Sequence, residues 1–136
     1  MESLKGKFAI VGLGLTEFGK VYGRSADDFA TEAIKLAVED AGLHKGDIDG
    51  LLMNAGITFA LDPRMQNYAG LPNLSVLNLM QAWGATAGEM VQFAGMAVEA
   101  GLANYVACVF ADAPLTQEKA GSAGAYAHTG GPSGIS

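Results

Sequence analysis

A turn that could bind a reacting group follows the apolar run that ends near residue 80. Gly84, Ala85 and Thr86 open a predicted helix there, directly after Trp83. The N-terminus of a helix stabilises negative charge, and enzymes often place a nucleophile at such a turn. Threonine without an adjacent base is a poor nucleophile, and this stretch offers no base. The turn therefore predicts a substrate-binding site formed by Trp83, Gly84, Ala85 and Thr86, without an attacking side chain.

Two roles remain open for Trp83. The indole could pack as a hydrophobic staple or interface anchor before the helix, or it could form the wall of a substrate pocket. The sequence favours neither interpretation over the other.

The remaining reactive side chains indicate little chemistry. Cys108 lies within the apolar segment "YVACVFA" and is expected to be a small buried hydrophobic residue. A single cysteine forms no internal disulfide, which fits a reducing cytoplasm. His44 is expected in a solvated turn and His128 lies near the C-terminal end. Neither has Cys, Asp or Glu at metal-ligand spacing, so no metal site is predicted.

Composition and motifs exclude several binding functions. The segment "GLGLTEFG" has Glu17 where a dinucleotide-binding loop needs its third glycine, and its helix begins only near Ser25. A net charge of −6 with 8 scattered basic residues argues against nucleic-acid binding. No apolar run reaches the roughly 18 residues that a membrane span needs, and the N-terminus lacks the pattern of a signal peptide. We expect a cytoplasmic protein.

Strand and helix patterns alternate along the chain, which predicts an α/β fold with a mixed or parallel sheet. The expected strands cover residues 8–13, 50–55, 75–80 and 105–111, and the expected helices run from Ser25 to Gly42 and over 85–100. The linking segment 56–72 looks like a long functional loop with exposed Met65 and Tyr68. We expect a domain over residues 1–112 and a Gly/Ala-rich loop or disordered tail over 113–136.

The helix over residues 85–100 is apolar on nearly every side. Its polar residues Thr86, Glu89, Gln92 and Glu99 fall on one arc, and small or apolar residues surround the rest. A helix of this composition is normally packed on most sides. One four-stranded sheet covers only one side, so the helix is expected to need a second layer that this chain does not supply.

Several segments together resemble the thiolase superfamily, in particular proteins of the lipid-transfer or sterol-carrier-protein-x type. The matching pieces are "IVGLGLTEFGK", "GRS", "EDAGL", "DIDGLL", "LPNLSVLNL" and "MAVEAGLANYVACV", which span most of residues 7–112. The resemblance implies the first half of a thiolase-fold N-terminal domain, with one helix buried between two sheets of a five-layered αβαβα architecture. It also places the nucleophilic cysteine of typical members at Gly84, within one residue.

A subgroup without that cysteine cleaves β-hydroxyacyl-CoA thioesters by retro-aldol chemistry, and "WGATAG" resembles it. The resemblance implies a role in steroid or lipid side-chain degradation, an acyl-CoA substrate that supplies coenzyme A, and no covalently bound cofactor. It further implies a homodimer, a small OB-fold partner subunit, and proton-transfer residues outside this chain. A β-ketoacyl-CoA thiolase (acetyl-CoA acyltransferase) and a non-catalytic scaffold subunit are the alternatives.

Overall fold

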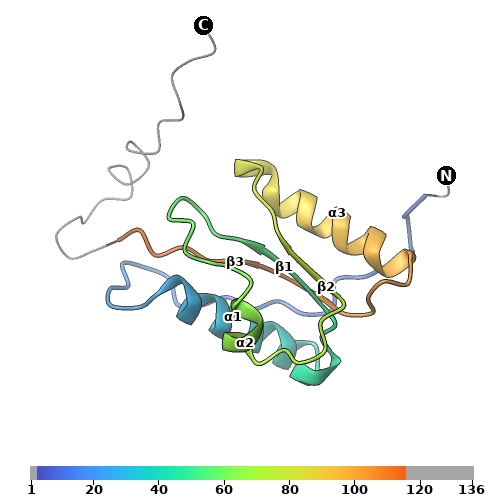
Figure 1. Ribbon diagram of the computed structural model, residues 1–136, viewed down its shortest axis with the longest axis horizontal. Helices are drawn as coiled ribbons and strands as arrows, with labels where there is room; N and C mark the ends of the chain where they lie inside the picture. Colours follow the sequence, from blue (N-terminus) through green and yellow to red (C-terminus); the bar gives the residue numbers. More distant parts are fainter. Residues whose placement is uncertain (1–2, 116–136) are drawn as a thin grey trace, which may run out of the picture.

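The computed structural model describes residues 3–115 and contains a three-stranded parallel sheet between helices (Figure 1). The strand order is β2-β1-β3, so β1 is the central strand. The helices and strands are α1 (Ala26–Asp40), β1 (Gly50–Asn54), α2 (Met65–Ala69), β2 (Val76–Leu79), α3 (Thr86–Glu99) and β3 (Val106–Phe110). Two 3-10 turns, η1 (Lys45–Asp47) and η2 (Trp83–Ala85), complete the fold. The expected α/β class is confirmed.

Both ends of α1 follow from local sequence. Ser25 accepts a hydrogen bond from the Asp28 N–H at 3.1 Å, and Asp28 accepts one from the Ser25 N–H at 2.9 Å, which forms a capping box. These hydrogen bonds lower the pKa of Asp28 below its ordinary value. Gly42 ends the helix with φ +68°, the left-handed conformation that glycine adopts without steric cost.

The face of the sheet that α1 and α2 cover holds the main core. Leu51 and Met53 of β1 are fully buried there. The side chains from α1 are Ala26, Ala30, Ile34 and Val38, and α2 adds Met65 and Ala69. The expectation of an exposed Met65 is wrong, because residues 65–69 form a short helix that packs this side chain into the core; Tyr68, on the same helix, is 58% exposed as expected.

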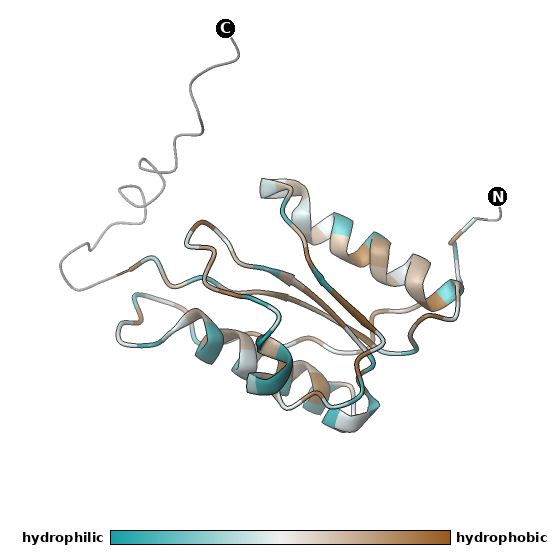
Figure 2. Cartoon of the chain, viewed as in Figure 1, coloured by the Kyte–Doolittle hydropathy of each residue, from teal (hydrophilic) through white to brown (hydrophobic). Residues whose placement is uncertain are grey.

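Among the described helices, α3 is the one that covers the opposite face of the sheet (Figure 1). Leu52 of β1 and Met90 and Ala97 of α3 are buried between them, whereas Met96 is 45% exposed on α3. Figure 2 shows mainly brown and pale residues along α3 with a few teal ones, while α1 and α2 carry more teal residues. The second layer expected over α3 stays a prediction, because residues 3–115 include no element on its outer side.

The strand expected over residues 8–13 is wrong. These residues are extended but join no strand ladder within the described range. They are held by packing instead: a Cβ on Gly12 would lie 2.3 Å from the Ala37 carbonyl oxygen, and one on Gly14 would lie 2.0 Å from that of Ala33. The segment therefore lies directly against α1 without a hydrogen-bonded neighbour that would make it a strand.

Candidate functional site

The candidate site lies where the parallel strands end. In open parallel sheets, ligands bind beyond the carboxyl ends of the strands. The loops after β1, β2 and β3 all emerge on this edge, as does the N-terminus of α3 (Figure 1). Two polar side chains, Asn54 and Asp112, connect these loops.

Asn54, the last residue of β1, connects the loops after β1 and β2. Its Nδ2 donates to the Met80 carbonyl at 2.8 Å and to Gln81 Oε1 at 2.6 Å. Its Oδ1 accepts a hydrogen bond from the Gly56 N–H at 3.2 Å, and Gln81 Nε2 returns a bond to the Gly56 carbonyl at 2.9 Å. Asn54 is 4% exposed, so loss of these bonds would leave buried polar groups unpaired. The network fixes the residues that lead into Trp83.

Asp112 connects the loops after β1 and β3. Its carboxylate accepts hydrogen bonds from the Ile57 N–H at 2.7 Å and from the Thr58 hydroxyl. Gly56 is required beside it, because its φ is +60° and a Cβ would lie 2.2 Å from Asp112 Oδ2. Asn54 and Asp112 were not predicted from the sequence. A polar residue at or just after the end of an apolar strand, as in "GLLMN" and "VFAD", is the signal that marks them.

Trp83 is held in a strained conformation with its side chain outward. Its φ is +53°, a left-handed value that costs a non-glycine residue about 1–2 kcal/mol. The residue is 63% exposed, so the described residues do not bury it as a hydrophobic staple would be buried. Strained residues cluster at ligand-binding and active sites, where the surrounding structure imposes them.

Thr86 imposes the conformation of this turn. Its hydroxyl donates to the Trp83 carbonyl at 2.8 Å and accepts from the Ala82 N–H at 2.8 Å. Thr86 is only 3% exposed. Both hydrogen-bonding functions of this hydroxyl are therefore used within the turn, which fits a positioning role better than attack on a substrate.

Gly84 and Ala85 leave the start of α3 open. Both are exposed, and a Cβ on Gly84 would meet no atom within 4 Å. Ala85 is the N-cap of α3 and supplies no side-chain cap. The structure thus places the four predicted site residues in one turn, with Trp83 projecting, Gly84 and Ala85 open to solvent, and Thr86 buried beneath. Their role in substrate binding stays a prediction.

Cys108 differs in part from its expected state. It lies in the middle of β3, in register with Leu52, but the residue is exposed rather than buried. Partial burial of the thiol nevertheless raises its pKa to about 11. The thiol is therefore protonated at neutral pH and is a weak nucleophile.

The described residues form no other obvious reactive centre. His44 is exposed at the start of η1, and His128 lies outside the described range. Within residues 3–115 no three His, Cys, Asp or Glu side chains gather as metal ligands. Among the described helices, none has the length and apolar character needed to cross a membrane.

Comparison with known proteins finds similarity to an aldolase and to a CoA lyase. It is 38% identical over 112 residues to a steroid side-chain-cleaving aldolase of Thermomonospora curvata, covering 79% of this chain and 27% of the relative. It is 39% identical over 107 residues to the 17-hydroxy-3-oxo-4-pregnene-20-carboxyl-CoA lyase of Mycobacterium tuberculosis, covering 76% of this chain and 26% of the relative. No family model matches the sequence.

A solved structure of an aldolase is also similar to this chain. The Ltp2-ChsH2(DUF35) aldolase superposes with a TM-score of 0.68 at 36% identity, and the match covers 78% of this chain and 28% of the solved chain. This chain thus spans about a quarter of the length of each protein that it matches.

These relatives correct the family assignment made from the sequence. The thiolase superfamily, of the lipid-transfer or sterol-carrier-protein-x type, is wrong, because the matching proteins are aldolases and a lyase. Motif resemblance could not separate these possibilities, since it lies largely in the strand–helix framework and not in residues that perform a reaction. The three-stranded parallel sheet does not distinguish them either, because such sheets occur in many α/β enzymes.

Proposed function

We propose that this chain is part of a lyase that cleaves a carbon–carbon bond of a β-hydroxyacyl-CoA by retro-aldol chemistry, with a steroid side chain as the acyl group. Two relatives that share more than a third of their aligned residues with it carry names of this activity. In the structure, the turn at Trp83 supports the proposal most directly. Trp83 is strained and exposed, the Thr86 hydroxyl binds its carbonyl, and the turn contains no free nucleophile.

The reaction needs proton transfer and enolate stabilisation. A base removes the proton of the β-hydroxyl group, the bond between the α- and β-carbons breaks, and its electron pair moves into the thioester as an enolate. Protonation of the α-carbon then gives a ketone and a shortened acyl-CoA. This sequence needs no acyl-enzyme, which fits the engaged hydroxyl of Thr86 and the protonated thiol of Cys108.

In this proposal the residues of the turn bind the substrate. The exposed indole of Trp83 contacts the apolar acyl group, because a large aromatic face buries much apolar area at low entropic cost. Gly84 and Ala85 leave room for the thioester at the start of α3. Thr86 and Asn54 act as positioning residues, one beneath the turn and one before it.

Further parts of the proposal concern components outside the described residues. Coenzyme A enters as part of the substrate, and no covalently bound cofactor takes part. The base and acid come from outside residues 1–136. We further propose a homodimer and a small OB-fold partner subunit, in the cytoplasm; the solved relative, described as an Ltp2-ChsH2(DUF35) aldolase, supports a partner subunit.

Turnover by the intact protein with its partner subunit tests this function. A CoA thioester of a 17-hydroxy steroid 20-carboxylic acid should yield a 17-ketosteroid and a shortened acyl-CoA in equal amounts, as followed by liquid chromatography and mass spectrometry. Trp83→Ala should raise KM by about tenfold or more through loss of aromatic contact. The matched control is Tyr68→Ala, because Tyr68 is similarly exposed but lies on α2. Failure to form the ketone, or equal effects of the two substitutions on KM, would contradict the proposal.

A non-catalytic scaffold is the second candidate, and the exposed apolar side of α3 favours it. Met96 is 45% exposed on a helix with few charged residues, as an interface helix would be. If this chain only supports a catalytic subunit, Trp83→Ala should leave KM unchanged while Met96→Asp weakens assembly in size-exclusion chromatography.

A further inference from the structure

A second strained and exposed aromatic residue follows β1. Among residues 3–115, Phe59 and Trp83 are the two non-glycine residues with a positive φ, +52° and +53° respectively. Bulky residues rarely adopt this conformation, because their Cβ comes too close to the neighbouring backbone. The two residues are also exposed to nearly the same extent, 61% for Phe59 and 63% for Trp83. Phe59 therefore repeats the combination of strain and exposure that characterises Trp83.

Hydrogen bonds join the loop of Phe59 to the loop of Trp83. Phe59 lies in the loop after β1 and Trp83 in the loop after β2, and both loops emerge at the end of the sheet where α3 begins (Figure 1). Gln81 Nε2 donates to the Gly56 carbonyl at 2.9 Å, so a direct bond links the two loops. The Asn54 side chain bonds to both Gln81 and Gly56. The two strained aromatic residues therefore belong to one hydrogen-bonded unit.

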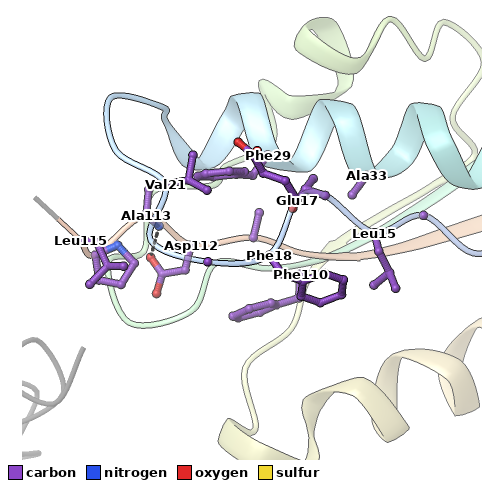
Figure 3. Close-up of a pocket in the computed structure, with 15 residues that line it drawn as sticks. Leu15, Glu17, Phe18, Val21, Phe29, Ala33, Phe110, Asp112, Ala113 and Leu115 are labelled. Atoms are coloured by element: carbon purple, nitrogen blue, oxygen red, sulfur yellow. Dashed lines mark hydrogen bonds between the residues drawn. The ribbon is translucent and has the colours of Figure 1, made fainter. Parts of the chain in front are cut away.

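The chain is anchored on both sides of Phe59. Before it, the Asp112 carboxylate accepts hydrogen bonds from the Ile57 N–H at 2.7 Å and from the Thr58 hydroxyl. Figure 3 shows Asp112 just beyond the end of β3, beside a cavity of about 310 Å³. After Phe59, the Leu61 side chain is 1% exposed and packs in the main core. These anchors impose the strained conformation of Phe59 and leave its side chain in solvent.

This arrangement fits contact with a ligand better than a role in stability. Strained residues persist where the surrounding structure imposes them, and they cluster at ligand-binding and active sites. Aromatic rings offer a large apolar face to a ligand. Two rings on anchored loops favour a rigid polycyclic group over a flexible chain, because a rigid group loses little conformational freedom when it binds.

We propose that Phe59 is a second substrate contact, which together with Trp83 selects a rigid polycyclic acyl group. The inference rests on the proposed function, because it assigns Phe59 to the same substrate. Asp112 is a positioning residue for Phe59, in the way that Thr86 is for Trp83. The long segment 56–72, expected from the sequence to be functional, thereby acts through the residues that directly follow β1.

Inhibition of the intact protein with its partner subunit tests the two halves of the substrate separately. The 17-ketosteroid product carries the rings without CoA, and free CoA carries no rings. Phe59→Ala should raise the KM of the steroid CoA thioester and the inhibition constant of the ketosteroid about fivefold or more, without raising that of free CoA. Tyr68→Ala, similarly exposed but on α2, should leave all of these constants unchanged. An unchanged ketosteroid constant in Phe59→Ala, or an equal rise for free CoA, would overturn the inference.

Thermal unfolding of the same variants separates substrate contact from packing. Phe59→Ala should change the Tm of the intact protein by no more than about two degrees, because the ring lies in solvent when no substrate is bound. A fall of more than about five degrees would show that the ring packs against another part of the protein, and would overturn the inference. Failure of the wild type to form the ketone would refute the proposed function. Ketone formation with an unchanged KM in Phe59→Ala would refute this inference alone.

Discussion

The amino ends and the carboxyl ends of the strands are each held together by a polar residue, Asp49 just before β1 and Asn54 at its end. The hydrogen bonds of these two residues position different features. At the amino edge, the Asp49 carboxylate accepts hydrogen bonds from the backbone N–H groups of Asn104 and Tyr105, each at 2.8 Å. Its carbonyl also accepts from the Ser75 N–H at 2.7 Å. This edge joins the starts of all three strands and holds no residue in a strained conformation.

At the carboxyl edge, where the strands end, the corresponding hydrogen bonds position a strained and exposed aromatic residue. Asn54 fixes the residues before Trp83, and Thr86 fixes the turn after it. Stability alone does not require a tryptophan with φ +53° at 63% exposure. The comparison teaches that similar hydrogen-bond networks can serve two purposes, joining strands at one edge and presenting a side chain at the other.

The largest effect is expected from Asn54→Ala. Removal of this side chain leaves the part-buried carbonyl of Met80 and the buried N–H of Gly56 unpaired, which should lower the free energy of unfolding by about 1–3 kcal/mol. It should also raise KM, because the Trp83 turn loosens. The control is Asn73→Ala, which removes one exposed hydrogen bond to Gly46 and should change the free energy by about 0.5 kcal/mol or less. If urea denaturation showed that the two variants lose equal free energy of unfolding, the special role of Asn54 would be contradicted.

A smaller effect, opposite in sign for stability, is expected from Trp83→Gly. Glycine adopts φ +53° without the strain of a side chain, so the free energy of unfolding should rise by up to about 1 kcal/mol. Substrate binding should weaken at the same time, whereas Trp83→Phe should keep most of it. A loss of stability in Trp83→Gly would show that the indole packs in the folded protein, and would contradict its assignment to substrate contact.

The smallest effect concerns the amino ends of the strands, where the contribution of Asp49 to stability is lost in acid. Partial burial acts to raise the pKa of Asp49, but hydrogen bonds from Tyr105 and Asn104 outweigh it, so the pKa is lower than its ordinary value of 3.8. The stability that these bonds provide is therefore present above about pH 4 and is lost as the pH falls through the lowered pKa. The difference in urea midpoint between the wild type and Asp49→Asn should narrow between pH 6 and pH 3, with KM unchanged at pH 7. A constant difference would contradict this account.

Local sequence predicted the elements whose ends are determined locally. The capping box at Ser25 and the left-handed Gly42 are properties of a few adjacent residues, and α1 forms between them as expected. The strand expected over 8–13 failed for the opposite reason. Apolar, β-branched residues favour a strand, but a strand exists only when a neighbour pairs with its backbone.

The candidate site was only partly visible in the sequence. Small residues at the start of a helix indicated the turn, and all four predicted residues lie in it. The strain at Trp83 could not be predicted, because a positive φ is normally assigned to the adjacent Gly84. Asn54 was missed because a single amide after an apolar strand forms no motif, and its partners lie 26 and 27 residues away in sequence.

Turnover in D2O without added free CoA tests the central claim most directly. Retro-aldol cleavage by the intact protein and its partner subunit should release ketone and acyl-CoA in equal amounts, with a single deuterium at the α-carbon where the enolate is protonated. Mass spectrometry of the protein during turnover should show no added acyl group. A covalent acyl-enzyme, or a requirement for free CoA as a second substrate, would contradict the account.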